Sequence, residues 1–408
     1  MGHPWEQRKL RDVATDFIVP MRDKPKSFGG TIPWTRIEDI EGRSISRSLT
    51  DQNVSEETIK TMNLKIIPKG SLIVSASASF GIVALVKADL ITNQTFIGIV
   101  PSDNIDVEFL FYSFMSPFLR KEMKDEAAGS TIFYIPQDRF KNMRIFVPER
   151  SEQIRICTLF SNLDNLITLH QRKLDLLKEK KKGLLQKMFP KPGENKPELR
   201  FSGFTDPWEQ RKVREISEIV GGGTPSTNNP DYWDGDIDWY TPAEITDDRF
   251  AFRSQRRITG AGLKNSSAKI LPTDRTILFT SRAGIGKSAI LKAPGATNQG
   301  FQSLVLNDSA DPKFVYSATD FIKEKAERIA AGSTFSEISG KKLGEITLMI
   351  PSKPEQKQIG QFFESIDESI TLHQRKLDLL KEKKKGLFQK MFPKPGQQEP
   401  ELRFSEFR

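Results

Sequence analysis

The sequence predicts an α/β mixed fold in which two homologous domains are joined by two long antiparallel coiled-coil helices, forming a pseudo-twofold cyclic repeat. Three observations predict it. The eighteen residues ITLHQRKLDLLKEKKKGL occur at 167–184 and again, unchanged, at 370–387. Core-type residues recur with alternating spacings of four and three through both copies, as in a coiled coil. The segments before each copy mix apolar runs typical of strands with stretches typical of helices.

The repeat extends well beyond these eighteen residues. The offset of 203 between the copies also relates Pro4–Lys9 to Pro207–Lys212, which read PWEQRK in both places. The central module PELRFSGF at Pro197–Phe204 returns as PELRFSEF at Pro400–Phe407. In the middle of the chain this module is followed by PWEQRK. The C-terminal module joined to the N-terminal PWEQRK would therefore rebuild the central sequence. We therefore expect the termini to lie close together.

The repeat also sets the expected domain limits, and 408 residues are enough for two or three domains. It divides the chain into a first domain at 1–150, a first helix at 151–190, a second domain at 191–352, a second helix at 353–393 and a tail at 394–408 that packs near the N-terminus. Between their shared motifs the two domains have diverged.

The two long helices are expected to begin near Glu152 and Glu355 and to stop before Pro190 and Pro393, because proline cannot continue a helix. About 38 residues would span roughly 57 Å. The predicted coiled-coil seam consists of Leu163, Ile167, His170, Leu174, Leu177, Lys181 and Leu184 in the first helix and Ile366, Ile370, His373, Leu377, Leu380, Lys384 and Leu387 in the second.

Polar residues and glycines interrupt this apolar pattern. We interpret His170 and His373 as residues that set the register, because no nucleophile or metal ligand lies near them in the sequence. Gly183 and Gly386 should each cost about 1 kcal/mol relative to alanine, which a long seam can absorb. If each domain is compact, the cyclic pattern places the start of the first helix near the end of the second, which makes the helices antiparallel.

Composition narrows the class of protein. Apolar residues make up 37% and charged residues 28%, as in a globular protein with real cores. The sequence has no run of about 18 apolar residues, the length that a membrane span requires. The N-terminal residues lack the apolar segment of a signal peptide. The single cysteine, Cys157, cannot form an internal disulfide and is expected to be a small buried residue. These features predict a cytoplasmic protein without a membrane association.

Positive charge is concentrated on the repeated helices. The net charge is +9, and each copy from Arg172 or Arg375 carries seven basic and two acidic residues over sixteen positions. The two copies thus account for the whole excess of positive over negative charge. Such a run is usually the solvated face of a helix, so charge by itself is weak evidence for nucleic-acid binding.

The diverged domains contain strand-like runs at 71–74 and 276–280 and helical stretches at 106–124 and 313–330. Signals of catalysis are missing. The stretch ending in Gly286-Lys287-Ser288 resembles a phosphate-binding loop, but the required first glycine is replaced by Ser281. Asp231, Asp234, Asp236 and Asp238 have no convincing metal-ligand spacing, and three histidines with one cysteine make a zinc site unlikely. We therefore expect a non-catalytic chain that binds no metal and no cofactor.

Polar and basic loops at matching places in the two domains remain as candidate binding residues. Ser75–Phe80 aligns with Thr280–Ile285, and Trp34–Arg36 lies near the place of Trp239–Thr241. Arginine, hydroxyl and amide side chains suit phosphates and base edges. An ordinary surface loop is the alternative for any one of them. The candidate DNA-binding residues are Thr35, Arg36, Ser75, Ser77, Ser79, Tyr240, Thr241, Ser281, Arg282 and Lys287.

Over its whole length the chain resembles the specificity subunits of type I restriction-modification systems. Two variable domains, two long near-identical helices and a circular repeat are typical of that family. So are the segments LDLLKEKKKGLLQKMF at Leu174–Phe189, TNQGF at Thr297–Phe301 and SRAGIG at Ser281–Gly286. The first domain departs from the last two motifs, with Thr95 where the second has Gly300.

The resemblance implies a function. Each variable domain would be a target-recognition domain that reads one half of a two-part sequence in double-stranded DNA. The helices would fix the spacing of the halves and dock two methyltransferase (M) subunits, and restriction (R) subunits would join them. S-adenosylmethionine, ATP and Mg²⁺ would be bound by those partners. Because the domains differ, the two half-sites should differ in sequence.

Two other readings are open on the sequence. A coiled-coil interaction scaffold without a DNA role would explain the helices but not the paired, diverged domains. An autonomous nuclease or methyltransferase would need catalytic motifs that we do not find.

Overall fold

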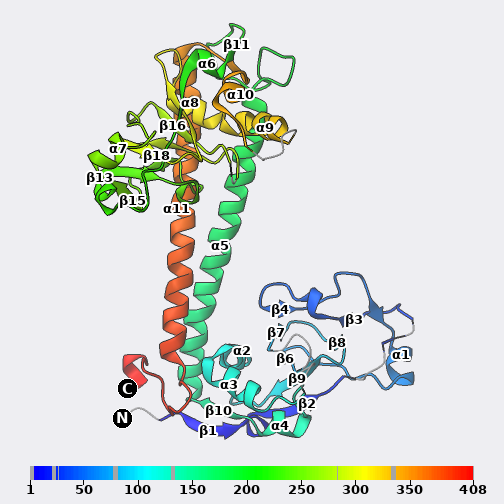
Figure 1. Ribbon diagram of the computed structural model, residues 1–408. Coiled ribbons are helices and arrows are strands. Elements are labelled where there is room, and N and C mark those ends of the chain that lie inside the picture. The colour runs from blue at the N-terminus through cyan, green and yellow to red at the C-terminus, as the bar shows by residue number, and fades with distance from the viewer. Residues whose placement is uncertain are drawn as a thin grey trace. The chain divides into compact units, whose positions relative to one another are not determined.

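The structure is a computed structural model that describes residues 4–20, 24–25, 27–76, 81–129, 134–282, 284–331 and 337–407. The chain packs as two compact units, one formed by 1–169 with 377–408 and the other by 170–376. Each unit holds one diverged domain and about half of each long helix (Figure 1). A unit is therefore assembled from two separate stretches of helix.

The first unit contains three sheets. Its five-stranded sheet has the order β2 (Ala14–Ile18), β9 (Phe96–Pro101), β6 (Leu72–Ser75), β7 (Val83–Val86) and β4 (Ser44–Ile45). Its three-stranded sheet has the order β5 (Asn53–Val54), β3 (Ile32–Thr35) and β8 (Ile91–Thr92), and β1 (Glu6–Lys9) pairs with β10 (Arg144–Val147). The helices of this domain are α1 (Glu56–Thr61), α2 (Val107–Met115), α3 (Pro117–Asp125) and α4 (Gln137–Asn142).

The second unit repeats this topology strand for strand. Its five-stranded sheet has the order β12 (Ser217–Gly221), β19 (Gln302–Leu306), β16 (Thr276–Phe279), β17 (Ser288–Leu291) and β14 (Phe250–Ala251). The three-stranded sheet is β15 (Arg256–Ile258), β13 (Trp233–Tyr240) and β18 (Gly295–Thr297), and β11 (Glu209–Lys212) pairs with β20 (Thr347–Ile350). Its helices are α6 (Val213–Ile216), α7 (Gly260–Lys264), α8 (Pro312–Ser317), α9 (Thr319–Ala330) and α10 (Gly340–Gly344).

The central strand of each larger sheet is buried on both faces. In β16, Ile277 and Phe279 belong to the core that includes helix α8, whereas Leu278 belongs to a second core on the other face. Leu72 and Ile73 of β6 divide in the same way. Side chains alternate across a strand, so a continuous apolar run fills two cores at once. This explains why the strands appear in the sequence as unbroken apolar runs.

Each helical stretch expected in the domains is broken in two. The predicted helix at 106–124 divides at Ser116, which caps α3, and Pro117 occupies the first turn of that helix. The stretch at 313–330 divides at Ala318, between α8 and α9. There Thr319 donates its hydroxyl to the carbonyl of Tyr316, a local bond that competes with continued helix.

The two long helices, α5 (Arg150–Met188) and α11 (Lys353–Met391), have 39 residues each, close to the expected limits. They run antiparallel in both units (Figure 1). In the first unit the rings of Phe160 and Phe388 lie 5.2 Å apart, and in the second Nδ1 of His170 lies 3.0 Å from Nδ1 of His373. Every predicted seam side chain is buried or half-buried.

The shared modules after each helix hold the start of the other helix. In the second unit Arg200 binds the carboxylate of Glu355, which is fully buried, at 2.7 Å. In the first unit Arg403 of the C-terminal tail binds the buried Glu152 at 2.7 Å. The repeat offset of 203 relates Arg200 to Arg403 and Glu152 to Glu355, so the tail makes the contact that the central linker makes in the second unit.

Within the part of the chain that the structure describes, no helix has the length and apolar character needed to cross a membrane.

Candidate nucleic-acid interface

Two loops predicted from the sequence converge with the TNQGF motif in the second unit. The amide of Asn298 donates to the carbonyl of Tyr240 at 3.0 Å, and the amide of Ser281 donates to the carbonyl of Gly300 at 2.8 Å. The loop after β13, the β16–β17 turn and the loop before β19 are thereby tied together. We call these three segments the recognition loops of the second unit.

The first unit builds the same arrangement. The amide of Asn93 donates to the carbonyl of Thr35 at 3.3 Å, and that of Ala76 to the carbonyl of Thr95 at 3.1 Å. All four positions are 205 residues before their counterparts in the second unit. The backbone framework of the recognition loops is therefore common to both domains although most of their side chains differ.

The β16–β17 turn has a conformation that explains its glycine. The amide of Thr280 donates to the carbonyl of Lys287 at 2.9 Å, and Gly286 adopts φ +87. Gly81 is the counterpart in the first unit, with φ +80. This left-handed region favours glycine. A strand follows the turn, whereas a phosphate-binding loop opens a helix, so the rejection of that motif fits the observed fold.

Four of the ten candidate residues are buried: Thr35, Ser75 and Ser281 are 0% exposed and Tyr240 is 2% exposed. The hydroxyl of Thr35 donates to the carbonyl of Ile91 at 3.2 Å. These side chains lie inside the loop framework, and a ligand could reach them only after local opening. Ser77 and Ser79 lie outside the described residues.

The other four candidates reach the surface. Lys287 is exposed, and Arg36, Thr241 and Arg282 are half-buried. Arg36 and Thr241 occupy equivalent positions, because each precedes a short 3₁₀ turn, Ile37–Asp39 or Pro242–Glu244, whose last carboxylate accepts from its amide at 2.7 Å. The guanidinium of Arg36 also lies 5.6 Å from the ring of Trp34. The two domains thus present different side chains from the same place.

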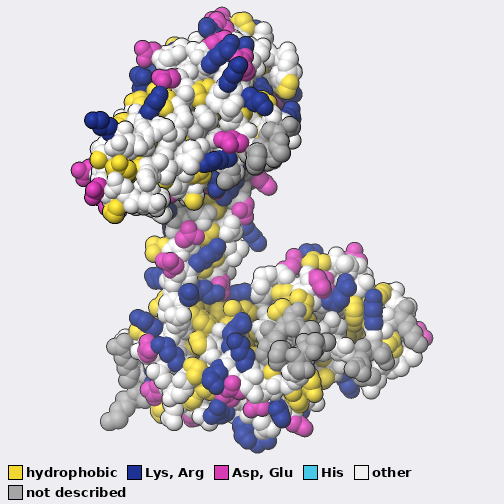
Figure 2. All heavy atoms as spheres, viewed as in Figure 1, with side chains coloured by type: hydrophobic (Ala, Val, Ile, Leu, Met, Phe, Trp, Pro, Cys, Tyr) yellow, Lys and Arg dark blue, Asp and Glu magenta, His cyan; other side chains and the backbone are white. Residues whose placement is uncertain are grey.

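Sequence reasoning missed a basic and aromatic edge in the second unit. Phe252 is 66% exposed, and Arg253 and Arg256 beside it are also exposed. The guanidinium of Arg256 stacks 3.9 Å from the ring of Trp233. The signal was present as the run FRSQRR at 252–257, where basic residues adjoin an aromatic one. On the visible surface of each unit in Figure 2, basic and acidic side chains are interspersed, so charge alone does not mark this edge.

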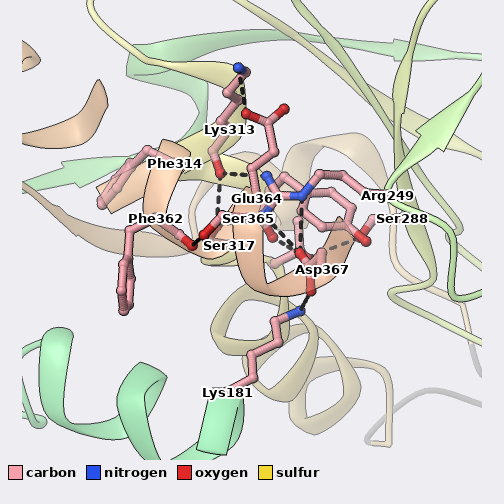
Figure 3. A network of polar contacts seen from close by, with 12 residues as sticks. Lys181, Arg249, Ser288, Lys313, Phe314, Ser317, Phe362, Glu364, Ser365 and Asp367 are labelled. Atoms are coloured by element: carbon pink, nitrogen blue, oxygen red, sulfur yellow. Dashed lines mark hydrogen bonds and ion pairs between the residues drawn. The ribbon is translucent and has the colours of Figure 1, made fainter. Parts of the chain in front are cut away.

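A charged junction attaches each domain to the helices. In the second unit Asp367 of α11 binds Lys181 of α5 at 2.7 Å and Arg249, from the loop before β14, at 2.9 Å (Figure 3). The Arg249 side chain is only 3% exposed and lies 4.5 Å from the ring of Tyr316. One carboxylate therefore joins both helices to the edge of the five-stranded sheet.

The first unit has a similar junction in which a tyrosine is inserted between the arginine and the aspartate. Asp164 binds Lys384 and lies 3.8 Å from Arg43, the counterpart of Arg249. Tyr112 stands between them, accepting from Arg43 at 2.5 Å and donating to Asp164 at 2.8 Å. Burial and the hydrogen bond to Asp164 raise the pKa of Tyr112, so its phenol stays protonated as a donor. The second unit has the shorter Ser317 at this place on α8, and its arginine contacts the aspartate directly.

Among the described residues, no group of three or more His, Cys, Asp or Glu side chains is placed to hold a metal ion. Asp238, one of the acidic residues noted in the sequence, accepts from Ser254 at 3.1 Å and pairs with Arg257 at 3.4 Å. Its role in the structure is to hold β13 and β15 together.

The chain belongs to the family of type I restriction modification DNA specificity domains, whose model matches residues 3–179 and 205–382. It is therefore a type I restriction-modification specificity subunit, as the sequence resemblance indicated. The two matched stretches are the two halves of the repeat.

Curated relatives agree. The MjaIX specificity subunit of Methanocaldococcus jannaschii is 36% identical over 189 residues, which is 45% of this chain and 44% of that protein. The putative MjaX specificity subunit from the same organism is 24% identical over 401 residues, covering 94% of this chain and 91% of the relative. The chain thus spans less than half of the first relative and nearly all of the second.

Solved structures share the fold. A type I restriction-modification S subunit from M. genitalium has a TM-score of 0.64 at 16% identity, covering 95% of this chain and 96% of that one. A chain from a study of complex assembly and conformational transition of the type I R-M system has a TM-score of 0.51 at 17% identity, with the same coverage. The predicted fold class is confirmed by the duplicated topology and by this likeness.

Proposed function

We propose that each recognition domain of this chain reads one half of a two-part sequence in double-stranded DNA, with an unread gap between the halves. One observation carries the proposal: the recognition loops have the same backbone framework in both units but present different side chains from it. Arg36 in one unit has Thr241 as its counterpart in the other, and Thr95 has Gly300. A shared scaffold with different surface residues is suited to two different half-sites.

Arg282 and Lys287 are the strongest base or phosphate contacts among the candidates in the second unit. Both belong to the β16–β17 turn, which is held at its base by the bond from Thr280 to Lys287 and by the bond from Ser281 to Gly300. Because the backbone of the turn is already fixed, binding need not order it, which lowers the entropic cost of a contact.

The long helices would dock two methyltransferase subunits. Leu169 and Leu176 on α5 are 62% and 57% exposed, and their counterparts Leu372 and Leu379 on α11 are 66% and 64% exposed. The exposed leucines thus occupy equivalent places on the two helices. Equivalent exposed apolar residues on both helices suit two copies of one partner.

In this proposal the chain contributes recognition and carries out no bond-making step. S-adenosylmethionine is bound by the methyltransferase subunits, and ATP and Mg²⁺ are used by restriction subunits that join the complex. The methyltransferase modifies one adenine in each half-site, and the chain determines which adenines those are.

The test is to co-express the chain with its methyltransferase subunit and to map modified adenines by sequencing. We expect a two-part motif with an unread gap that disappears when the chain is omitted. Arg282→Ala and Lys287→Ala should weaken binding to the cognate duplex or relax one half of the motif, whereas Lys357→Ala, an exposed lysine on α11, should do neither. A continuous motif would contradict the two-reader arrangement. An assembled complex without modification would favour a scaffold role.

A further inference from the structure

One surface element is identical in the two recognition domains. Asn93-Gln94 in the first unit and Asn298-Gln299 in the second form the same turn. The side-chain oxygen of each asparagine accepts the amide two residues later, from Thr95 at 3.2 Å and from Gly300 at 2.8 Å. The asparagine amides, as described above, donate to the neighbouring recognition loop. Each glutamine therefore sits on a turn that is fixed on both sides.

The glutamine side chains project outward from these turns. Gln94 and Gln299 are exposed, while Phe96 and Phe301, two residues further on, are 0% exposed and anchor the loop. The hydroxyl of Thr224 donates to Oε1 of Gln299 and so holds its carboxamide. An exposed side chain with a held polar end is suited to contact a ligand.

The surroundings of the two glutamines differ. Gly300 follows Gln299 because a Cβ at that position would lie 2.6 Å from Cγ of Pro242. The first unit has Thr95 at this place and Ile37 in place of the proline. Arg282 follows Ser281, whose amide donates to the carbonyl of Gly300. Its counterpart in the first domain is the uncharged Ser77. The glutamines are thus a constant feature within variable surroundings.

We propose that Gln94 and Gln299 contact the sugar-phosphate backbone at equivalent places in the two half-sites and set the register of each domain on the duplex. This inference rests on the proposed function. Apart from the adenine that is modified, two domains that read different sequences share only the sequence-independent part of the duplex, which is the backbone. The carboxamide NH₂ is a donor suited to a phosphate oxygen. Base choice then belongs to the neighbouring side chains that differ.

A different use of the same side chain predicts a different result. Glutamine can also bind adenine through two hydrogen bonds, which would make these residues read an A·T pair common to both halves. A third possibility is that two identical residues meet two copies of the methyltransferase subunit. The experiment must separate backbone contact, base reading and partner contact.

The test uses the full complex with the methyltransferase subunit and carries Gln94→Ala, Gln299→Ala or both. Loss of one hydrogen bond to a charged phosphate corresponds to about ten- to hundredfold weaker binding of the cognate duplex, and the effects should multiply in the double variant. The modified motif and the assembly of the complex should be unchanged. Gln361→Ala, an exposed glutamine on α11, is the matched control and should bind normally.

Gln299→Lys gives a second, independent readout. A lysine can replace a donor to phosphate, so binding should be retained and should depend more steeply on salt, by about one unit of slope. An adenine reader would instead lose affinity and relax one position of the motif in both the lysine and the alanine variants.

Three results would overturn the inference: unchanged affinity in the double alanine variant, a changed base in the motif, or loss of complex assembly. If the unmodified complex itself produces no two-part motif, the proposed function fails first. The two failures are therefore distinguishable.

Discussion

Lys181 and Asp367 pair at 2.7 Å across the antiparallel helices of the second unit, although a lysine at a seam position breaks the apolar pattern. The reason is visible in Figure 3, where Asp367 also binds Arg249 from the recognition domain. Lys384 and Asp164 make the corresponding pair in the first unit. The polar interruption of each seam is thus the place where a domain is attached to its helices, which the heptad pattern alone does not reveal.

Asp367→Asn should destabilise the second unit by roughly 3 kcal/mol. The substitution leaves the guanidinium of Arg249 buried and Lys181 half-buried without their common anion, and breaking a buried pair from one side carries a large penalty. Chemical denaturation of the full chain measures it. Glu368→Gln, an exposed neighbour on the same helix, should stay within about 0.5 kcal/mol of the original. Equal stabilities for the two variants would show that the junction contributes nothing.

The C-terminal tail should be needed for the stability of the first unit. Arg403→Ala leaves Glu152, 1% exposed, without its partner and should cost about 3 kcal/mol. The double variant Arg403→Met, Glu152→Leu removes both charges and should recover most of that loss. Arg200→Ala, opposite the fully buried Glu355, should behave like Arg403→Ala. If the double variant is no more stable than the single one, the uncompensated charge is not the cause.

The architecture was predictable because the sequence contains an exact repeat and a regular spacing of apolar residues. The identical copies predicted the helices, and the seam spacing predicted which side chains face inward, including His170 and His373. The cyclic pattern predicted the antiparallel direction. Strand limits were also close: the expected run 71–74 corresponds to β6 at Leu72–Ser75. These features depend on residues near one another in the chain or on exact repeats.

The details of the interface depend on contacts between distant residues and could not be predicted in the same way. Tyr240 and Ser281 look like surface loop residues in the sequence, yet both are buried because each of their two loops is bonded to the loop of Asn298 and Gly300. Arg249 is 118 residues from the aspartate that it binds. No local pattern distinguishes it from the exposed Arg253.

His170 should make the stability of the second unit fall as the pH drops below about 6.5, the ordinary pKa of histidine. Burial, with smaller contributions from Lys376 and His373, lowers the pKa of His170 in the folded chain. A base whose folded pKa is below its unfolded pKa binds fewer protons when folded, so acid favours unfolding. The Nδ1 atoms of His170 and His373 lie 3.0 Å apart, so one ring donates while the other accepts.

This pH effect is measured by denaturation between about pH 7.5 and pH 5.5. The double variant His170→Gln, His373→Gln should flatten the profile over this range. Parallel profiles for the original chain and the double variant would mean that the pair does not titrate with folding.

Glycine-to-alanine substitutions should have opposite effects at two kinds of site. Gly183 and Gly386 lie within the long helices, and an added Cβ would meet no atom within 4 Å. Alanine at either place should raise stability by about 0.5–1 kcal/mol, because glycine loses more backbone freedom on folding. At Gly300 the added Cβ would lie 2.6 Å from Pro242, so Gly300→Ala should be destabilising and should shift the loop that carries Gln299. Thermal denaturation ranks the three variants, and DNA binding should weaken for Gly300→Ala alone. If Gly183→Ala or Gly386→Ala destabilised the chain, other atoms would have to lie against the helix surface at that position and clash with the added methyl group.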